Sequence, residues 1–120
     1  MGCAMVKARA SKANTRKFKS GLEEQYAQRL HLLRCAEEIA EWAYEPMRLR
    51  IGDGAWYTPD FVVILPSGEF EIHETKGFMR EAARVRLQAA ATLHPWFQFF
   101  VVRNNGGAWQ LEPLKAWLQR

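Results

Sequence analysis

Hydrophobic positions at helical spacing predict two helices. Leucine and tyrosine recur every three or four residues from Leu22 to Leu33, which predicts a helix that ends at Arg34 or slightly beyond. The segment from Phe78 to Leu93 is rich in alanine and leucine, and it stops at His94-Pro95 because a residue before proline rarely continues a helix. A short amphipathic helix is also predicted from Glu112-Pro113 onward.

Shorter hydrophobic runs between these segments predict strands. The unbroken apolar run from Phe61 to Leu65 predicts a central strand that is buried on both faces. Trp96 to Val102 is a second such run, and the helix before it favours parallel pairing with the preceding strand. The order of elements predicts an α/β fold with a central mixed sheet of about four strands flanked by helices.

The segment before the first apolar run alternates basic and hydrophobic residues. Arg48 and Arg50 alternate with hydrophobic neighbours, and Asp53-Gly54 marks a turn into Trp56 and Tyr57. The two arginines are solvated charges by default and phosphate contacts as the alternative. The two aromatic residues are expected mostly in the core, although Tyr57 is also close enough to the next strand to border a substrate.

Pro66-Ser67-Gly68 separates the first apolar run from the next strand. These residues suit a three-residue hairpin loop, in which proline sets the first position and glycine supplies the left-handed conformation at the end. If Leu65 then pairs with Glu69, Asp60 lies opposite Glu74, and their carboxylates share a face of the sheet. A loop of two or four residues would place the two carboxylates on opposite faces.

The face that carries Asp60 and Glu74 also carries Lys76, although the alternation predicts apolar side chains there. Two close carboxylates repel each other, and carboxylate, carbonyl and water oxygens are the ligands that Mg²⁺ prefers. The lysine could orient a water or stabilise a phosphate oxygen as charge develops. The alternative interpretation is a structural salt bridge between Lys76 and one of the two acids.

Basic residues concentrate at the N-terminus. Residues 1–20 hold six of the 17 lysines and arginines and no acidic residue, so the remaining hundred residues carry 11 basic and 13 acidic ones. Weak hydrophobic periodicity predicts a flexible arm at 1–19, followed by a single domain at 20–120. A basic arm favours a polyanion such as DNA, and Lys17 and Lys19 are its candidate phosphate contacts.

Cysteine usage and hydropathy indicate a cytoplasmic protein. Cys3 and Cys35 have no spacing to histidine that suggests a metal site, and both are expected to be reduced thiols. No apolar run approaches the roughly 20 residues that span a membrane, and the N-terminus lacks the apolar core of a signal peptide. No association with a membrane is therefore expected.

Pro59-Asp60 and Glu74-Thr75-Lys76, on either side of the predicted hairpin, resemble the signature of the PD-(D/E)xK nuclease superfamily. The resemblance extends over about residues 20–103 and implies a restriction-endonuclease-like core. It implies a Mg²⁺-dependent endonuclease, with Mn²⁺ as a substitute, in which Asp60, Glu74 and the Thr75 carbonyl hold the metal. Lys76 would orient or activate the attacking water.

The first predicted helix adds a candidate acid. Ser20 and Glu23 match the S-x-x-E capping box, in which each side chain accepts a hydrogen bond from the backbone of the other. The segment from Lys19 to Tyr26 also resembles the first helix of small phage-encoded members of the superfamily and of TnsA-type transposase endonucleases. That resemblance implies that Glu23 binds a second metal ion or its waters, whereas Glu24 has no such match.

The resemblance implies hydrolysis of DNA phosphodiester bonds. Arg84 and Gln88, one turn apart on the second helix, are further candidate phosphate contacts. Small stand-alone members resemble Holliday-junction resolvases and phage recombination or packaging nucleases, so we expect a structure-specific enzyme that acts on branched DNA. Two cuts would require a homodimer, and a phage-encoded enzyme would act in the bacterial host cell.

Three alternatives stay open from the sequence. A TnsA-like transposase endonuclease subunit fits the segment around Asp60, although we expect no room for the second domain that such subunits carry. A DNA-binding module could keep the nuclease fold without catalysis. A structural interaction protein would bind no DNA in a salt-dependent way.

Overall fold

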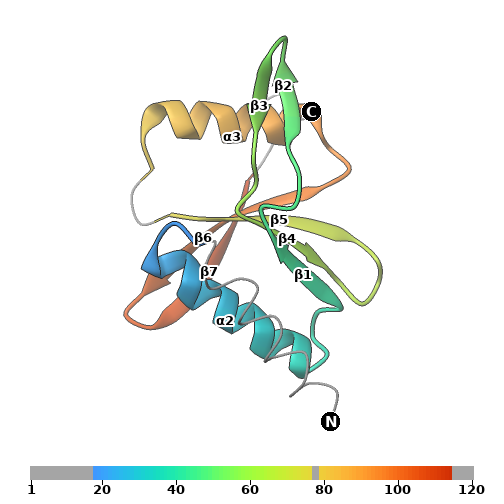
Figure 1. The fold of residues 1–120 in the computed structure, drawn as a ribbon, viewed down its shortest axis with the longest axis vertical. Coiled ribbons are helices and arrows are strands. Elements are labelled where there is room, and N and C mark those ends of the chain that lie inside the picture. The colour runs from blue at the N-terminus through green and yellow to red at the C-terminus, as the bar shows by residue number, and fades with distance from the viewer. Residues whose placement is uncertain (1–17, 77–78, 115–120) are drawn as a thin grey trace.

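Two helices and seven strands form in residues 18–76 and 79–114, the parts of the chain that the computed structural model describes. In chain order they are α2 (Gly21–Cys35), β1 (Glu41–Tyr44), β2 (Leu49–Gly52), β3 (Ala55–Tyr57), β4 (Phe61–Ile64), β5 (Phe70–Thr75), α3 (Glu81–Leu93), β6 (Gln98–Asn105) and β7 (Ala108–Leu114) (Figure 1). Five strands form a mixed sheet in the order β1-β4-β5-β6-β7, and β2 and β3 form a separate hairpin. The predicted α/β class is confirmed, with one more strand in the sheet than expected.

One helix covers each face of the sheet, α2 on one side and α3 on the other (Figure 1). Along β4, Phe61 and Val63 belong to the core under α2, whereas Val62 belongs to the core under α3. All three side chains are buried, because successive side chains of a strand point to opposite faces. The prediction of a strand buried on both faces is confirmed.

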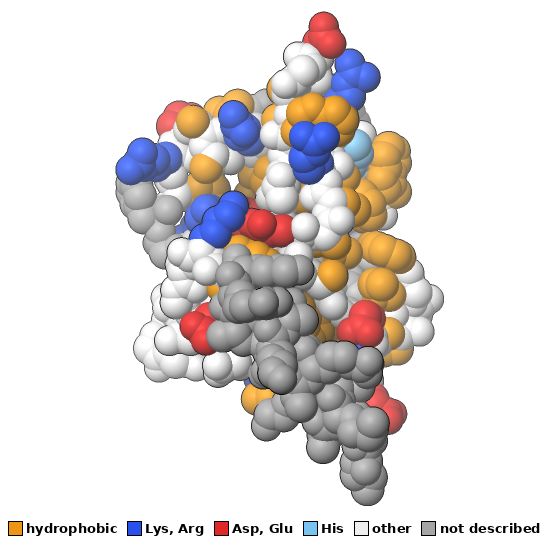
Figure 2. All heavy atoms as spheres, viewed as in Figure 1, with side chains coloured by type: hydrophobic (Ala, Val, Ile, Leu, Met, Phe, Trp, Pro, Cys, Tyr) orange, Lys and Arg blue, Asp and Glu red, His pale blue; other side chains and the backbone are white. Residues whose placement is uncertain are grey.

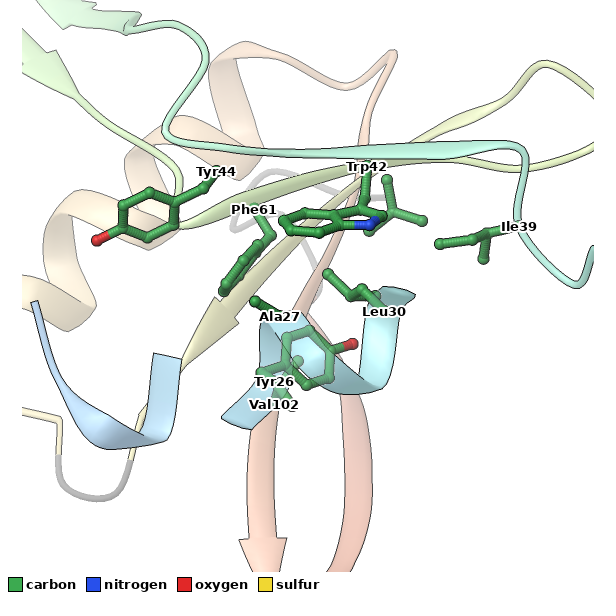
Figure 3. Packing of buried hydrophobic residues seen from close by; sticks show 9 residues of the cluster. Tyr26, Ala27, Leu30, Ile39, Trp42, Tyr44, Phe61 and Val102 are labelled. Atoms are coloured by element: carbon green, nitrogen blue, oxygen red, sulfur yellow. The ribbon is translucent and has the colours of Figure 1, made fainter. Parts of the chain in front are cut away.

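Aromatic rings dominate the core between α2 and the sheet. The Phe61 ring lies 5.4 Å from the Tyr26 ring, 6.0 Å from the Trp42 ring and 5.3 Å from the Tyr44 ring, measured between centroids. Figure 3 shows side chains of α2 pointing toward Phe61 and Trp42 of the sheet. Such pairs add to the stabilisation from buried area, so this cluster fixes the beginning of β4 relative to α2.

The β4–β5 hairpin has the predicted loop and register. The Leu65 amide donates to the Glu69 carbonyl at 2.9 Å, and the Gly68 amide donates to the Leu65 carbonyl at 2.8 Å. Gly68 has a φ of 95°, in the left-handed region that favours glycine. Phe61 pairs with His73, and the next position along the same register sets Asp60 opposite Glu74.

The predicted helices differ from the observed ones at their ends. Helix α2 begins at Gly21, and the Ser20 hydroxyl accepts a hydrogen bond from the Glu23 amide at 3.2 Å. Helix α3 begins at Glu81, three residues later than expected, and its N-cap residue Arg80 makes no side-chain capping bond. The crossover through α3 connects β5 to β6 in parallel, as predicted.

The predicted start of a terminal helix at Glu112-Pro113 is wrong, because both residues lie in β7, and residues 115–120, where that helix would continue, lie outside the described residues. Gly106 and Gly107, with φ of 60° and 92°, form the turn that folds β7 back along β6. Proline is compatible with a strand at the edge of a sheet, where its missing N–H removes no bond to a further strand. β7 lies at such an edge, next to β6 alone.

The expectation that Cys35 is a reduced thiol is wrong, because this residue is disulfide-bonded. Cys3 lies outside the residues that the structure describes. The cysteines therefore give no support to the cytoplasmic location, which stays a prediction. Within residues 18–76 and 79–114, no helix is long and apolar enough to cross a membrane.

Candidate active site

Asp60 and Glu74 lie side by side where β4 begins and β5 ends. The Asp60 amide approaches Oε1 of Glu74 at 3.4 Å, and the two residues are only 6% and 7% exposed. This arrangement follows from the hairpin register, which puts both side chains on the α3 face of the sheet together with Val62 and Ile72. Two carboxylates therefore share one largely buried site.

Thr75 holds the Asp60 carboxylate in place. Both the amide and the hydroxyl of Thr75 donate to Oδ2 of Asp60, each at 3.0 Å. The resemblance had assigned a function only to the carbonyl of this residue, so the contribution of its amide and hydroxyl was missed. Thr75, which directly follows Glu74 in β5, thus orients Asp60, which directly precedes β4.

Tyr57 holds the other carboxylate. Its hydroxyl, at the end of β3, donates a hydrogen bond to Oε1 of Glu74. Burial, and then the charge of Glu74, raise the pKa of Tyr57 well above its usual range, so the phenol remains a donor. The sequence had placed Tyr57 in the core or against a substrate, and the structure adds a direct bond to Glu74.

Lys76 lies at the open edge of the carboxylate pair. Its Nζ is 3.7 Å from Oε2 of Glu74, and its side chain is 31% exposed. The Lys76 amide donates to the Val102 carbonyl at 3.1 Å, which fixes the backbone of this residue to β6. The separation exceeds hydrogen-bonding distance, so the ammonium group is near Glu74 and also accessible from solvent.

Glu23 of α2 acts on the carboxylate pair through its charge, which raises the pKa of both Asp60 and Glu74. It is buried, and its Oε1 accepts hydrogen bonds from the Lys19 amide and the Tyr44 hydroxyl, both at 2.8 Å. The capping box is therefore only half formed, because the Glu23 carboxylate accepts from Lys19 instead of Ser20. Glu24 makes no side-chain hydrogen bond or ion pair within the described part of the chain.

The carboxylates affect one another electrostatically. Burial, followed by the charges of Glu74 and Glu23, raises the pKa of Asp60 to about 8, against the opposing effect of the Thr75 hydrogen bonds. Burial also raises the pKa of Glu74, although Tyr57 and Lys76 lower it. Without a cation, the pair therefore retains a proton near neutral pH.

The donor set fits a cation that keeps part of its water shell. Among the residues that the structure describes, no three His, Cys, Asp or Glu side chains are arranged to hold a metal ion. Hydrogen bonds within this part of the chain reach Oδ2 of Asp60 and Oε1 of Glu74, which leaves Oδ1 and Oε2 as ligands. Mg²⁺ is commonly held by one or two carboxylates and several waters, so Oδ1 of Asp60 and Oε2 of Glu74, the latter with Lys76 at 3.7 Å, suit this ion.

The predicted phosphate contacts differ in their exposure and in whether their charge already has an acidic partner. Lys19 lies 3.0 Å from Oε2 of Glu45, so its charge has an acidic partner, and Lys17 lies outside the described residues. Arg84 is exposed and borders a pocket of about 230 Å³ between α3 and the β6–β7 strands. Gln88 is half-buried, and its carbonyl accepts a hydrogen bond from Thr92.

Basic and acidic side chains gather on one face of the molecule. Figure 2 shows Lys and Arg side chains over α3 and the β2–β3 hairpin, and acidic side chains at the centre of the same face. Arg86 of α3 donates to the Trp56 carbonyl at 3.4 Å and so connects the helix to the hairpin. A polyanion on this face would meet these basic side chains around the acidic ones.

On the opposite face of β5, Tyr26, His73 and Glu71 form a line of hydrogen bonds that the sequence did not predict. The Tyr26 hydroxyl lies 2.6 Å from Nδ1 of His73, and Nε2 of His73 lies 2.8 Å from Oε1 of Glu71. His73 is buried and directly precedes Glu74, so it faces α2 while Glu74 faces α3. These contacts tie β5 to α2 and so fix the strand that carries Glu74.

Comparison with protein-family models, with curated proteins and with solved structures gave no match to this chain.

Proposed function

We propose that this protein is a Mg²⁺-dependent DNA endonuclease with a restriction-endonuclease-like core of the PD-(D/E)xK type. One observation carries the proposal: Asp60 and Glu74 form a buried carboxylate pair with Lys76 beside it. Burying like charges together is costly for stability alone, and a divalent cation offsets that cost. The α/β sheet with a helix on each face is compatible with such a core.

Asp60 and Glu74 hold the metal ion in this proposal, together with the Thr75 carbonyl. When bound, Mg²⁺ supplies positive charge to the phosphate and lowers the pKa of a water. The hydrogen bonds from Thr75 occupy Oδ2 of Asp60 and so leave Oδ1 to face the metal ion. The hydrogen bond from Tyr57 occupies Oε1 of Glu74 and so leaves Oε2 to face it. Both carboxylates are thus oriented before the substrate arrives.

Lys76 and Glu23 complete the proposed machinery. Lys76 orients the attacking water and stabilises the negative charge that develops on the phosphate oxygens. Glu23 binds waters of the site or a second metal ion, a role that its position on α2 supports through its effect on the pKa of Asp60. The water attacks phosphorus, one P–O bond breaks, and the leaving oxygen is protonated.

DNA is the proposed substrate because of the basic surface around the acids. Lys17, Lys19, Arg84 and Gln88 are the proposed phosphate contacts, and Arg84 is the exposed cation among them on α3. Branched DNA and a homodimer are proposed by resemblance to small resolvases, and a phage-encoded enzyme of this kind would act in the bacterial host cell. A TnsA-like subunit and a non-catalytic DNA-binding module are the alternative proposals.

The test is cleavage of four-way junction, flap and duplex DNA by the full chain with Mg²⁺ or Mn²⁺. We expect Lys76→Ala and Asp60→Asn each to lower the rate by about a hundredfold or more, because each removes charge stabilisation from the transition state. Glu38→Gln, which changes an exposed acid after α2, serves as the matched control and should keep the rate.

Absence of cleavage on every substrate with either metal would contradict the nuclease proposal. Salt-dependent DNA binding without cleavage would then favour the non-catalytic module, and absence of such binding would favour a structural interaction protein.

A further inference from the structure

Trp56 is an exposed tryptophan on the outer face of the β2–β3 hairpin. Leu49 and Tyr57 are paired across this hairpin and are buried against α3, whereas the next pair, Arg50 and Trp56, points away from that core. Trp56 is 40% exposed, although the sequence predicted a core position. The hairpin projects beyond the sheet alongside α3 (Figure 1).

One arginine contacts the ring of this tryptophan, and another contacts its backbone. The guanidinium carbon of Arg48 lies 4.5 Å from the centroid of the Trp56 ring, a cation–π arrangement. Arg86 of α3 donates to the Trp56 carbonyl. Arg48 has no acidic partner among the described residues, so its charge is available to a ligand. An aromatic ring bordered by unpaired positive charge is complementary to a nucleic acid, which combines aromatic faces with phosphates.

The Arg48–Trp56 pair lies close to the candidate active site along the chain. Trp56 directly precedes Tyr57, whose hydroxyl donates to Glu74, so the strand that carries the Trp56 ring is bonded to the candidate site, with the ring on the opposite face of the hairpin from Tyr57. A DNA strand held at Glu74 and Lys76 would therefore pass near the hairpin. Lys and Arg side chains cover this part of the same face (Figure 2).

We propose that the Arg48–Trp56 pair binds an unpaired nucleobase of the strand being cut, and this inference rests on the proposed nuclease function. Bases within a duplex are stacked on each other and offer no free face to a side chain, whereas bases in a flap, a gap or a junction do. The pair therefore selects DNA that has a single-stranded segment beside the cleaved bond.

The proposal is tested by binding rather than by cleavage. Affinity of the full chain is measured at fixed salt, with Ca²⁺ in place of Mg²⁺, for a flap and a duplex of the same length. Trp56→Ala should weaken flap binding about tenfold or more and change duplex binding by less than about twofold, because stacking is lost only with the flap. Trp56→Phe, which keeps a ring, should recover most of the loss.

Phe70→Ala is the matched control, because Phe70 is an aromatic residue that is also 40% exposed but begins β5, at the opposite end of that strand from Glu74. It should leave both affinities unchanged. An equal loss on flap and duplex, or no loss on either, would overturn the stacking site. If Trp56→Ala weakens flap binding alone but the protein cuts no DNA, the stacking site is upheld and the nuclease proposal is rejected. If the protein cuts DNA and Trp56→Ala changes neither affinity, the nuclease proposal is upheld and the stacking site is rejected.

Discussion

Burial of Asp60, together with the charges of its acidic neighbours Glu74 and Glu23, raises its pKa to about 8. A carboxyl whose pKa is higher in the folded state binds its proton more tightly there. Its contribution to stability is therefore complete below the ordinary pKa of 3.8 and is lost as the pH rises toward 8. The metal-free protein should lose stability over this pH window.

Asp60→Asn should remove this loss. We expect the variant to gain free energy of unfolding over the unmodified protein in EDTA, from little at pH 4 to on the order of a few kcal/mol at pH 8. Thermal unfolding followed by circular dichroism at several pH values measures the difference. Asp53→Asn, which changes a fully exposed aspartate, is the matched control. A flat profile for Asp60→Asn would contradict the expected charge repulsion.

Residue identity alone revealed the candidate acids and the lysine, but not the groups that orient them. Asp60, Glu74 and Lys76 stand out because charged residues interrupt an apolar alternation. Tyr57, Tyr44 and the Thr75 hydroxyl act through contacts between elements, and nothing in their local sequence distinguishes them from core or surface residues. The one available signal was position: Tyr57 lies two residues before Pro59-Asp60, and Thr75 lies between Glu74 and Lys76.

At the scale of elements, the β4–β5 hairpin depends on Gly68. Its φ of 95° is unfavourable for any residue with a Cβ atom, although the space beside it is open. Gly68→Ala should therefore lower the free energy of unfolding by roughly 1–2 kcal/mol. Chemical denaturation measures this change.

Gly21 offers a matched control for this substitution. A Cβ at Gly21 also meets open space, but the residue begins α2 and has no positive φ. Gly21→Ala should keep or raise stability, because alanine favours helices. Equal losses for the two variants would show that backbone conformation at Gly68 is not the cause.

Turn chemistry made this hairpin predictable, whereas the C-terminal strand was not. Pro66, Ser67 and Gly68 specify the loop locally, and the loop then fixes the pairing of Asp60 with Glu74. Glu112-Pro113 has the local features of a helix start, but pairing with β6 determines its conformation. That pairing involves residues brought together by Gly106-Gly107, so tertiary contacts outweigh local preference.

For the whole molecule, metal binding should be linked to both folding and protonation. Mg²⁺ that binds only the folded chain raises the melting temperature, and the carboxylate pair must release its proton to bind the ion. We expect a larger increase at pH 8 than at pH 6, and proton release on Mg²⁺ binding at pH 7. Differential scanning fluorimetry and calorimetry in buffers of different ionisation enthalpy measure these effects.

Asp60→Asn should abolish the Mg²⁺-dependent increase, and Glu38→Gln should keep it. An increase that is the same in both variants would place the bound ion elsewhere in the protein.

The three-residue turn at the far end of the hairpin has an evolutionary consequence. Side chains alternate along β5, so His73 faces α2 while Glu74 faces α3. With a loop of three residues retained, insertion of one residue into Pro66-Ser67-Gly68 would set His73 opposite Asp60, and deletion of one would set Thr75 there, without altering any acid. If the proposed chemistry is under selection, the length of this turn is constrained as tightly as the carboxylates themselves, while its composition is free to vary around Gly68.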